Sequence, residues 1–355
     1  MLFLSGNEKK RWAELAEQVL TGDLSPASYG DGIRPNLLPA FYFYIGTLLA
    51  SKGRCTRGIE WLEAATLIED DSLFLSAFLL GFLGRQDGQF VMPARAFDDP
   101  RHFIHFASVP LMKEAREQFI VQCGHTLPSF HENLRIMDIG CGDGSLTVRL
   151  LRHLQDTGKA AEIEEILLID PSPAMIRLAE ETVREAYPES KITTMSGQFQ
   201  DVSGAIDRHF DVAVSSLAYH HMPYEQKQMH LQHLKPWIDH FLLFELDANN
   251  DTPVLDSPDL ALSVYQSYGR IIDFVFSHDA PVEVATGCVD CFLMTELVSL
   301  MTQPRRIRTE YHMLESQWND LFQTCLGPDF TLLCDSACYA DEYVSLFTMH
   351  YGRMG

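Results

Sequence analysis

A glycine-rich stretch at residues 135–145 places the strongest constraint on how this 355-residue chain can fold. An apolar run over residues 134–137 ends in Asp138, and a segment with helical periodicity follows over residues 146–154. Between them, glycines stand at alternate positions, Gly140, Gly142 and Gly144. Glycine tolerates a positive φ and lets a ligand approach the backbone closely, and a helix N-terminus offers N–H groups. The stretch therefore predicts a strand, a tight turn and a helix that hold a nucleotide-type cofactor.

Two classes of nucleotide-type cofactor use such a turn. The dinucleotide fingerprint requires Gly-x-Gly-x-x-Gly, and Ser145 stands where its third glycine would be. The spacing here is Asp-x-Gly-x-Gly-x-Gly, which resembles the first motif of class I S-adenosylmethionine-dependent methyltransferases. In that family the glycine loop carries the methionine part of the cofactor, and the acid that ends the strand lies close to it. The resemblance implies cofactor contacts from Asp138, Gly140, Cys141, Gly142 and Gly144.

The next predicted strand, over residues 165–170, also ends in an acid, Asp170. A carboxylate at this place accepts charge-assisted hydrogen bonds from both ribose hydroxyls, and an ordinary helix cap is the alternative role. Pro171 and Met175 resemble the second motif of the family, in which the apolar residue packs on the adenine. The resemblance implies that these three residues bind the cofactor.

Two further strands are predicted over residues 191–195 and 210–216. Gln198 and Phe199 follow the first of them, and the resemblance implies that they lie beside the adenine, although many relatives have Asp in place of Gln198. At the end of the fourth strand, the resemblance adds Ser216 and Leu217 to the expected cofactor contacts.

Adjacent histidines, His220 and His221, follow the fourth strand. Open α/β sheets bind their ligands at the carboxyl ends of the strands, and histidine titrates near neutral pH, so either ring is a candidate general base. We expect at least one of the two only to pack or hydrogen-bond at the pocket wall. Glu245 ends the predicted fifth strand at the same edge. There it takes part in base chemistry, holds a cationic acceptor, attracts an amine or lies solvated in a loop.

About sixty residues, 250–313, separate the fifth strand from the last helix and are mostly helical by pattern. Insertions at this point of the fold usually build the acceptor pocket, and helix packing is the alternative role for the residues within them. The candidate substrate contacts are Tyr219, Tyr265, Tyr268, Arg270 and His312.

The chain ends in two predicted strands, residues 330–335 and 343–350, joined by a short connection. They match the antiparallel sixth and seventh strands of the methyltransferase sheet, whereas an NAD-type sheet is wholly parallel. We therefore expect an α/β fold with a Rossmann-like seven-stranded sheet over residues 134–355.

Residues 1–100 are expected to form a helical domain, and residues 101–133 a helical linker or lid. One helix pair near residues 42–65 resembles a tetratricopeptide unit, but a stable array needs at least about three units. The helices therefore either cap the catalytic domain or dock a protein partner or a second copy of the chain. Residues 101–120 either cover the cofactor or simply pack on the core.

Composition narrows the partners and the compartment. A net charge of −22 without a basic run makes nucleic acid and anionic membrane unlikely partners. We find no apolar run of the roughly 20 residues that cross a bilayer, and no signal-peptide pattern at the N-terminus. Eight scattered cysteines fit reduced thiols in the cytoplasm. Cys288 and Cys291 are expected in a helix core rather than on a metal, so no metal is predicted.

Together these features predict an enzyme that methylates an oxygen or nitrogen of a small molecule, with S-adenosylmethionine as cofactor and S-adenosylhomocysteine as product. The first alternative is a non-catalytic protein that binds the cofactor and docks a partner through its N-terminal helices. An NAD-dependent oxidoreductase comes third, because Ser145 and the terminal hairpin both disfavour it.

Overall fold

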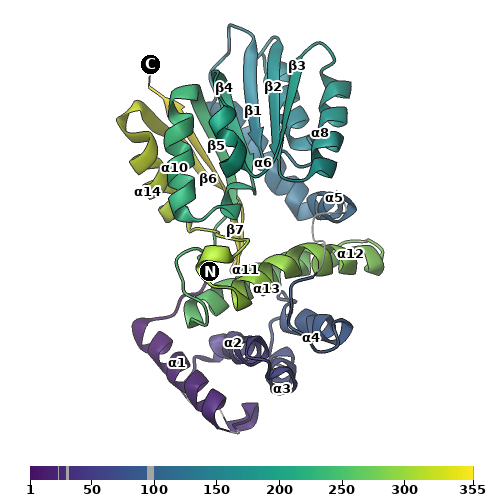
Figure 1. The fold of residues 1–355 in the computed structure, drawn as a ribbon, viewed down its shortest axis with the longest axis vertical. Helices are drawn as coiled ribbons and strands as arrows, with labels where there is room; N and C mark the ends of the chain where they lie inside the picture. The colour runs from purple at the N-terminus through teal and green to yellow at the C-terminus, as the bar shows by residue number, and fades with distance from the viewer. Residues whose placement is uncertain (23, 29–31, 94–99, 355) are drawn as a thin grey trace. The chain divides into compact units, whose positions relative to one another are not determined.

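The computed structural model describes residues 1–22, 24–28, 32–93 and 100–354, which form two compact units (Figure 1). The helical unit holds the described parts of residues 1–96, 248–311 and 341–344, and the sheet unit holds those of 97–247, 312–340 and 345–355. The expected insertion, residues 250–313, thus groups up to residue 311 with the N-terminal helices and not with the sheet. The expected boundary at residue 100 adjoins residues 94–99, which lie outside the described residues.

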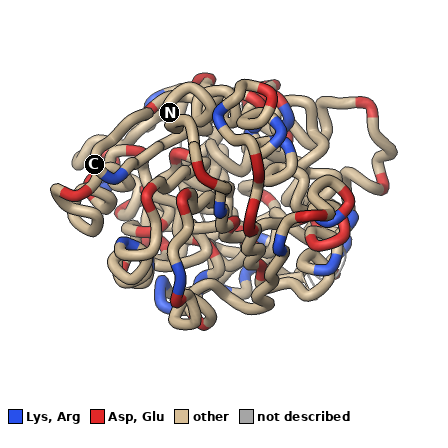
Figure 2. Tube along the Cα trace, turned by 90° about the horizontal axis from the view of Figure 1, so that it is seen from above, with Lys and Arg blue, Asp and Glu red and all other residues tan. Residues whose placement is uncertain are grey.

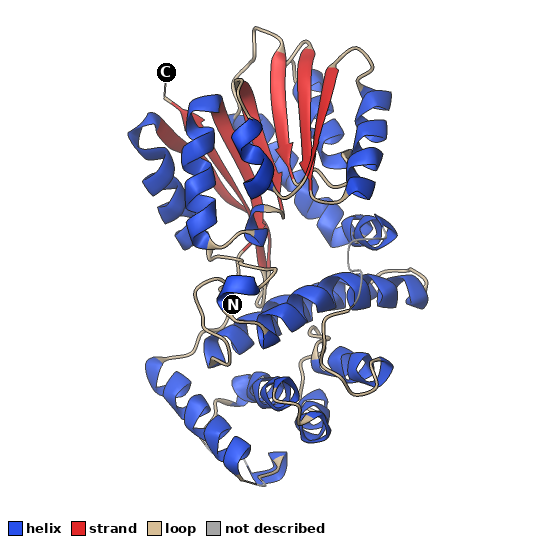
Figure 3. Ribbon diagram, in the orientation of Figure 1, coloured by secondary structure: helices blue, strands red, loops and turns tan. Residues whose placement is uncertain are grey.

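Seven strands form one mixed sheet in the order β3-β2-β1-β4-β5-β7-β6. Figure 3 shows the strands of this sheet in red with helices packed beside them. The strands are β1 (Leu134–Ile139), β2 (Ile163–Asp170), β3 (Lys191–Ser196), β4 (Phe210–Ser216), β5 (Ile238–Leu246), β6 (Phe330–Ala340) and β7 (Ser345–Arg353). The first five are parallel, and β7 pairs antiparallel with both β5 and β6. This arrangement confirms the predicted Rossmann-like sheet with its terminal hairpin.

The central strands are buried along almost their whole length, as expected for parallel strands covered on both faces. Strand order reverses between β1 and β4, where Asp138 pairs with Val214 and Ile139 with Ser215. In open α/β sheets, the carboxyl ends of the strands at such a reversal form the ligand-binding crevice.

The helices of the sheet unit are those that connect or cover the strands. They are α5 (Pro100–Ser108), α6 (Pro110–Thr126), α7 (Ser145–Asp156), α8 (Pro173–Ala186), α9 (Phe199–Val202), α10 (Tyr224–Leu234) and α14 (Glu315–Leu326). Short 3₁₀ turns add η3 (Ser203–Ala205), η4 (Tyr219–His221), η5 (Lys235–Trp237) and η8 (Gly327–Asp329). Against one face of the sheet, Trp318 of α14 and Leu231 of α10 pack into a large apolar core with Phe241 of β5.

The helical unit consists of α1 (Gly6–Thr21), α2 (Leu38–Ser51), α3 (Cys55–Thr66), α4 (Ser76–Arg85), α11 (Pro258–Phe276), α12 (Val282–Cys288) and α13 (Met294–Thr302), with 3₁₀ turns η1 (Pro26–Ser28), η2 (Pro35–Leu37) and η7 (Arg305–Ile307). Helices α2 and α3 approach so closely that a Cβ on Gly58 would lie 2.7 Å from the carbonyl oxygen of Gly46. They form the helix pair that the sequence pattern indicated.

One continuous helical run, residues 282–302, joins α12 and α13 through a π-helical segment, η6 (Val289–Leu293). It is long and apolar enough to cross a membrane by length and composition alone, with a mean hydropathy of 1.5. The expectation that no apolar run reaches this length is therefore corrected. Within the structure 72% of this window is buried, as in the core helix of a globular unit.

Charged residues of both signs lie along the described chain, with basic positions interspersed among acidic ones (Figure 2). Ion pairs within the sheet unit include Lys191 with Glu165 at 3.0 Å and Arg353 with Asp239 at 3.0 Å. Most such pairs are partly exposed and contribute little to stability, about 0–1 kcal/mol each.

Candidate functional site

The glycine loop turns sharply between β1 and α7, and all three of its predicted glycines adopt a positive φ. These angles are 76° at Gly140, 54° at Gly142 and 76° at Gly144. A Cβ would lie 2.2 Å from Ala218 Cβ at Gly140 and 2.8 Å from the Phe103 ring at Gly142. Only glycine meets both the backbone and the steric requirement, so the loop presents bare backbone beside the end of β4.

The acid at the end of β1, Asp138, is 2% exposed, and its two oxygens have different surroundings. Thr147 of α7 donates a hydrogen bond to Oδ2, whereas no described residue bonds to Oδ1, which is also buried. Burial raises the pKa of this carboxyl to about 6. A buried carboxylate with an unsatisfied oxygen is suited to a cationic ligand group.

At the end of β2, Asp170 accepts a hydrogen bond from the backbone N–H of Gly142 at 3.1 Å and one from that of Ser172 at 2.8 Å. It is 8% exposed, and burial raises its pKa. The carboxylate therefore fastens the glycine loop to the start of α8. Of its two predicted neighbours, Pro171 is exposed and Met175 is buried.

After β3, the two residues expected beside the adenine have different environments. Gln198 is exposed and accepts a hydrogen bond from the side chain of Gln200 at 2.6 Å. Phe199 is buried, with its ring 5.9 Å from that of Tyr219 and 5.4 Å from that of His230. Gln198 is therefore the one of the pair with solvent access.

The end of β4 carries two buried serines and a strained residue. The hydroxyl oxygens of Ser215 and Ser216 are buried and have no hydrogen-bond partner among the described residues. Leu217 follows with a φ of 50°, in the left-handed region that branched residues rarely adopt. Its N–H donates to Phe244 O at 2.8 Å, which ties this backbone to β5. Such strain concentrates at ligand sites.

His220 and Glu245 form a buried pair across the ends of β4 and β5. His220 Nδ1 lies 2.8 Å from Glu245 Oε2, and the backbone N–H groups of Ala218 and His220 donate to Oε1 at 3.2 and 3.3 Å. The carboxylate, which is 0% exposed, accepts the Nδ1 proton, so a neutral His220 carries its lone pair on Nε2. The two predicted residues are thus brought together, with Glu245 orienting the ring.

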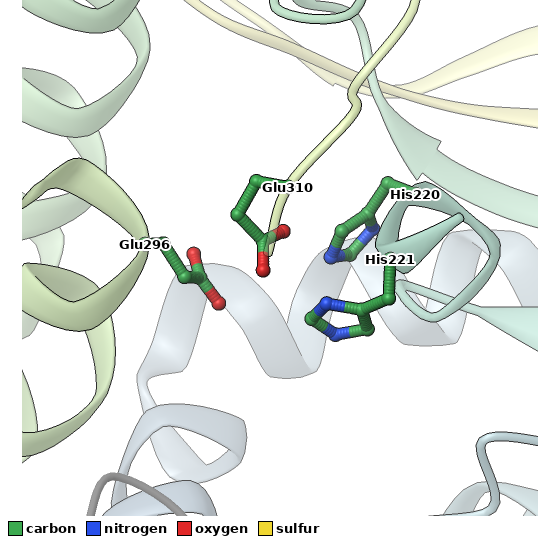
Figure 4. A group of neighbouring side chains, drawn as sticks. All are labelled: His220, His221, Glu296 and Glu310. Carbon is green, nitrogen blue, oxygen red and sulfur yellow. The ribbon is translucent and has the colours of Figure 1, made fainter. Parts of the chain in front are cut away.

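His312 lies on the same cluster, with its ring stacked on that of His220 at 3.9 Å between centroids. Burial lowers its pKa well below the usual range, so the ring is neutral. His221, in contrast, is exposed, and its ring lies 4.3 Å from that of His220 (Figure 4). The structure therefore brings His312 as well as Glu245 to the predicted histidine pair.

Three nitrogen and oxygen ligand atoms of His220, Glu245 and His312 lie within 4.8 Å of one another, close enough to surround a metal ion. The 2.8 Å separation of the His220–Glu245 pair is that of a hydrogen bond. No cysteine takes part in any such group among the described residues. Cys288 of the predicted Cys-x-x-Cys pair is instead buried among apolar residues of the helical unit.

Tyr219, one of the expected substrate contacts, is buried in the core, and its contact with a substrate stays a prediction. Its ring is 0% exposed in the apolar core, 5.5 Å from that of Phe241 and 6.3 Å from that of Trp318. Tyr219 and His220 are neighbours in the turn η4, and their side chains point in different directions. That of Tyr219 lies in the core, and that of His220 lies beside Glu245.

The other predicted substrate residues, on α11, are held within the helical unit. Tyr268 donates to Glu296 Oε2 at 2.9 Å, and Arg270 binds Asp341 and Asp273 at 2.6 and 2.5 Å. Tyr265 packs with its ring 5.5 Å from that of Phe43. Figure 4 also shows Glu296 and Glu310, which both belong to this unit and are buried. The contact of these α11 residues with an acceptor stays a prediction.

Sequence reasoning missed a buried cation beside the glycine loop. Arg116 of α6 is 6% exposed, and its guanidinium carbon lies 5.8 Å from the centroid of the Phe103 ring. Phe103 belongs to α5, within the expected lid, and its ring lies against Gly142. No motif marks Arg116, and the mixed polarity of α6 gives no sequence signal that this arginine is buried.

Comparisons with known proteins agree with this geometry. A family model described as a methyltransferase domain matches residues 136–239. An uncharacterized methyltransferase from Staphylococcus carnosus is 34% identical over 93 residues, which are 26% of this chain and 36% of that protein. The probable S-adenosylmethionine-dependent methyltransferase CRG1 from Saccharomyces cerevisiae is 25% identical over 162 residues, or 45% of this chain and 51% of that protein. The chain thus spans about a third to a half of the length of these curated relatives.

Among solved structures, that of SCL7 in Oryza sativa has a TM-score of 0.60 at 14% identity and covers 87% of this chain and 99% of that one. At such low identity the likeness concerns the fold alone. The strand order, the terminal hairpin and the family match over the glycine loop agree, and we conclude that the chain carries a class I S-adenosylmethionine-dependent methyltransferase domain.

Proposed function

We propose that the protein is an enzyme that transfers a methyl group from S-adenosylmethionine to an oxygen or nitrogen of a small-molecule acceptor. The observation that carries this proposal is the group of backbone and polar atoms at the carboxyl ends of β1 and β4. There, three glycines at positive φ lie beside buried polar atoms that no described residue satisfies: Asp138 Oδ1, Ser215 Oγ and Ser216 Oγ.

These residues fit the cofactor by their chemistry. The bare loop backbone admits close approach, the carboxylate of Asp138 suits the ammonium group, and Asp170 suits the ribose hydroxyls. S-adenosylmethionine supplies, when bound, a methyl group made electrophilic by its positively charged sulfur. The work of the chain is to exclude water and to align the acceptor, which supplies about 7–11 kcal/mol of a barrier.

For an acceptor that must lose a proton, His220 is the proposed base and Glu245 its positioning residue. The carboxylate holds Nδ1–H, leaves Nε2 as the basic nitrogen and stabilises the imidazolium that forms. His312 stays neutral against the His220 ring and adds no positive charge there. The acidic chain, at −22 net charge, supports a small metabolite over a nucleic acid as acceptor.

The first experiment is calorimetric titration with S-adenosylmethionine and, in parallel, with NAD. We expect saturable binding of S-adenosylmethionine alone, weakened in Asp170→Ala and unchanged in the matched control Asp201→Ala, an exposed acid of the same unit. Failure of the folded wild-type protein to bind S-adenosylmethionine refutes the proposal, and binding of NAD instead favours hydride transfer.

The second experiment screens phenols, carboxylic acids and amines for the formation of S-adenosylhomocysteine. With an active acceptor that must lose a proton, His220→Ala should abolish turnover. Glu245→Gln should shift the pH profile of turnover without a matching change in cofactor affinity. Wild-type turnover in both His220→Ala and His221→Ala contradicts the base. Binding of cofactor without turnover on any acceptor favours a non-catalytic protein instead.

A further inference from the structure

Two histidines of the sheet unit face the same carboxylate oxygen. His220 Nδ1 lies 2.8 Å and His312 Nδ1 lies 3.8 Å from Glu245 Oε2. Ligand atoms around one tetrahedral zinc ion, each about 2.0–2.2 Å from the metal, lie roughly 3.4 Å apart. The two separations fall on either side of this value. Small rotations of the rings, with shifts of about 0.5 Å, therefore suffice to place all three atoms around one ion.

The backbone holds the carboxylate in the orientation that such an ion requires. The N–H groups of Ala218 and His220 donate to Glu245 Oε1 at 3.2 and 3.3 Å, which leaves Oε2 toward the two rings. The ring of His312 is stacked on that of His220, with 3.9 Å between their centroids. Partners of this kind orient the ligands of metal sites and raise the affinity for the metal. The cluster is thus organised by its surroundings.

The donor atoms of the cluster define the kind of ion. Burial keeps His312 neutral by lowering its pKa, and a neutral imidazole nitrogen is a metal ligand. Two imidazole nitrogens and one carboxylate oxygen suit Zn²⁺ and similar transition metals, whereas Ca²⁺ and Mg²⁺ require oxygen ligands. We propose that His220, Glu245 and His312 bind a divalent transition-metal ion such as Zn²⁺, which takes the place of the proton on His220 Nδ1.

Binding of the ion would turn off the proposed base. The metal accepts the lone pair of His220 Nδ1, and the single ring proton moves to Nε2, so that no proton is gained or lost overall. A protonated Nε2 has no lone pair with which to accept a proton from an acceptor. This consequence rests on the proposed function, whereas the binding of the ion does not.

The binding test must distinguish this cluster from a second group of possible ligands. His209, Asp211 and Asp239 also bring three ligand atoms within 4.8 Å of one another, at the amino ends of β4 and β5. Zn²⁺ is therefore titrated calorimetrically into the wild-type protein, His312→Gln and the matched control His209→Gln. The electronic absorption of bound Co²⁺ identifies the type of ligand, because thiolates add a charge-transfer band.

We expect the wild-type protein to bind Zn²⁺ and His312→Gln to bind it at least about tenfold more weakly, since loss of a partner outside the first shell alone costs 10- to 100-fold. His209→Gln should bind it as the wild type does. Bound Co²⁺ should show no thiolate band, and an excess of Mg²⁺ should not displace it.

The effect on turnover is measured with an acceptor that must lose a proton. Zn²⁺ at ten times its measured dissociation constant occupies about nine tenths of the sites, so about a tenth of the turnover should remain. A chelator should restore the rest. Unchanged turnover at this Zn²⁺ concentration overturns the inferred loss of the base.

The metal site itself is overturned if the folded wild-type protein does not bind Zn²⁺, if His312→Gln binds it as tightly as the wild type does, or if His209→Gln alone weakens it. If His312→Gln does not fold, as judged by circular dichroism, the same comparison in His220→Gln decides. The Zn²⁺ titration needs no cofactor, so its failure is distinguishable from a failure to bind S-adenosylmethionine, which refutes the proposed function.

Discussion

Gly144 offers a stringent test of how the cofactor loop packs. It precedes α7 with a φ of 76°, and a Cβ at this position would lie 3.0 Å from Ala179 O and 3.1 Å from Val183 Cγ2, both on α8. The nearest of these atoms is backbone, which cannot move aside as a flexible side chain does. Gly144→Ala should therefore suffer both backbone strain and a steric clash.

Two control glycines separate the loss of stability caused by backbone strain from the loss caused by the steric clash. Gly158 has a φ of 69° and nothing within 4 Å of the position a Cβ would take, so Gly158→Ala should cost only the left-handed backbone, about 1–2 kcal/mol. Gly204 has open space and no positive φ, so Gly204→Ala should be neutral or stabilise by about 0.4–1 kcal/mol. Gly144→Ala adds overpacking of about 1–3 kcal/mol to the backbone strain, or about 2–5 kcal/mol in all.

The assay is thermal unfolding of the three variants, followed by far-ultraviolet circular dichroism. For a unit of this size, each kcal/mol shifts Tm by about 2–4 °C, so the order of melting should be Gly204→Ala above Gly158→Ala above Gly144→Ala. If Gly144→Ala melts with Gly158→Ala, the loop is not packed on α8 as the structure has it, and the steric reasoning is refuted.

Three further substitutions test polar groups of the sheet unit. The pKa of Asp138 is about 6 in the folded protein and 3.8 for an ordinary Asp, so the folded state holds this proton more tightly than the unfolded state does. The free energy of unfolding therefore falls as the pH rises from about 4 to 6 and the buried carboxyl ionises. Asp138→Asn should therefore raise the free energy of unfolding by up to about 3 kcal/mol at pH 7 and change little at pH 4, and equal effects at both pH values would contradict this. The hydrogen bond with Asp335 raises the pKa of Glu315 to about 8. The free energy of unfolding should thus fall as the pH rises from about 5 through 8. In denaturant titrations, Glu315→Gln should show a weaker pH dependence of this free energy than the wild type does. An unchanged pH dependence would show that the Glu315–Asp335 pair is not its source. Tyr219→Phe removes a buried hydroxyl with no hydrogen-bond partner among the described residues and should stabilise by about 1 kcal/mol in the same titrations, with a clear loss of stability showing that the hydroxyl is bonded.

Much of the sheet unit was predictable because its signals are local. Each parallel strand is a short apolar run, and the glycines of the loop are required by φ values that few other residues tolerate. The terminal hairpin was predictable for the same reason, since two strand patterns follow each other with a short connection. Each of these features depends only on the identity of residues that lie within a few positions of one another in the sequence.

The features that were not predicted depend on contacts between distant parts of the chain. Glu245 was recognised as an acid at the right edge, but its role in orienting His220 follows only from the pairing of β4 with β5. The grouping of residues 248–311 with the N-terminal helices likewise depends on packing between segments about 200 residues apart, such as the Tyr44 hydroxyl on Asp256 O at 3.0 Å. The burial of Tyr219 depends on the turn η4 in the same way, because neighbouring side chains in a tight turn point in different directions.

The unfavourable features of the sheet unit indicate where its function lies. A buried carboxylate at Asp138, a left-handed backbone at Leu217 and a buried guanidinium at Arg116 each reduce stability. They occur within or beside the ends of β1 and β4, whereas the strands themselves follow ordinary rules of burial and pairing. Natural sequences depart from local consistency mainly at functional sites. A ligand that pairs with both charges would restore part of the lost stability, so cofactor binding should also protect this edge of the sheet against unfolding.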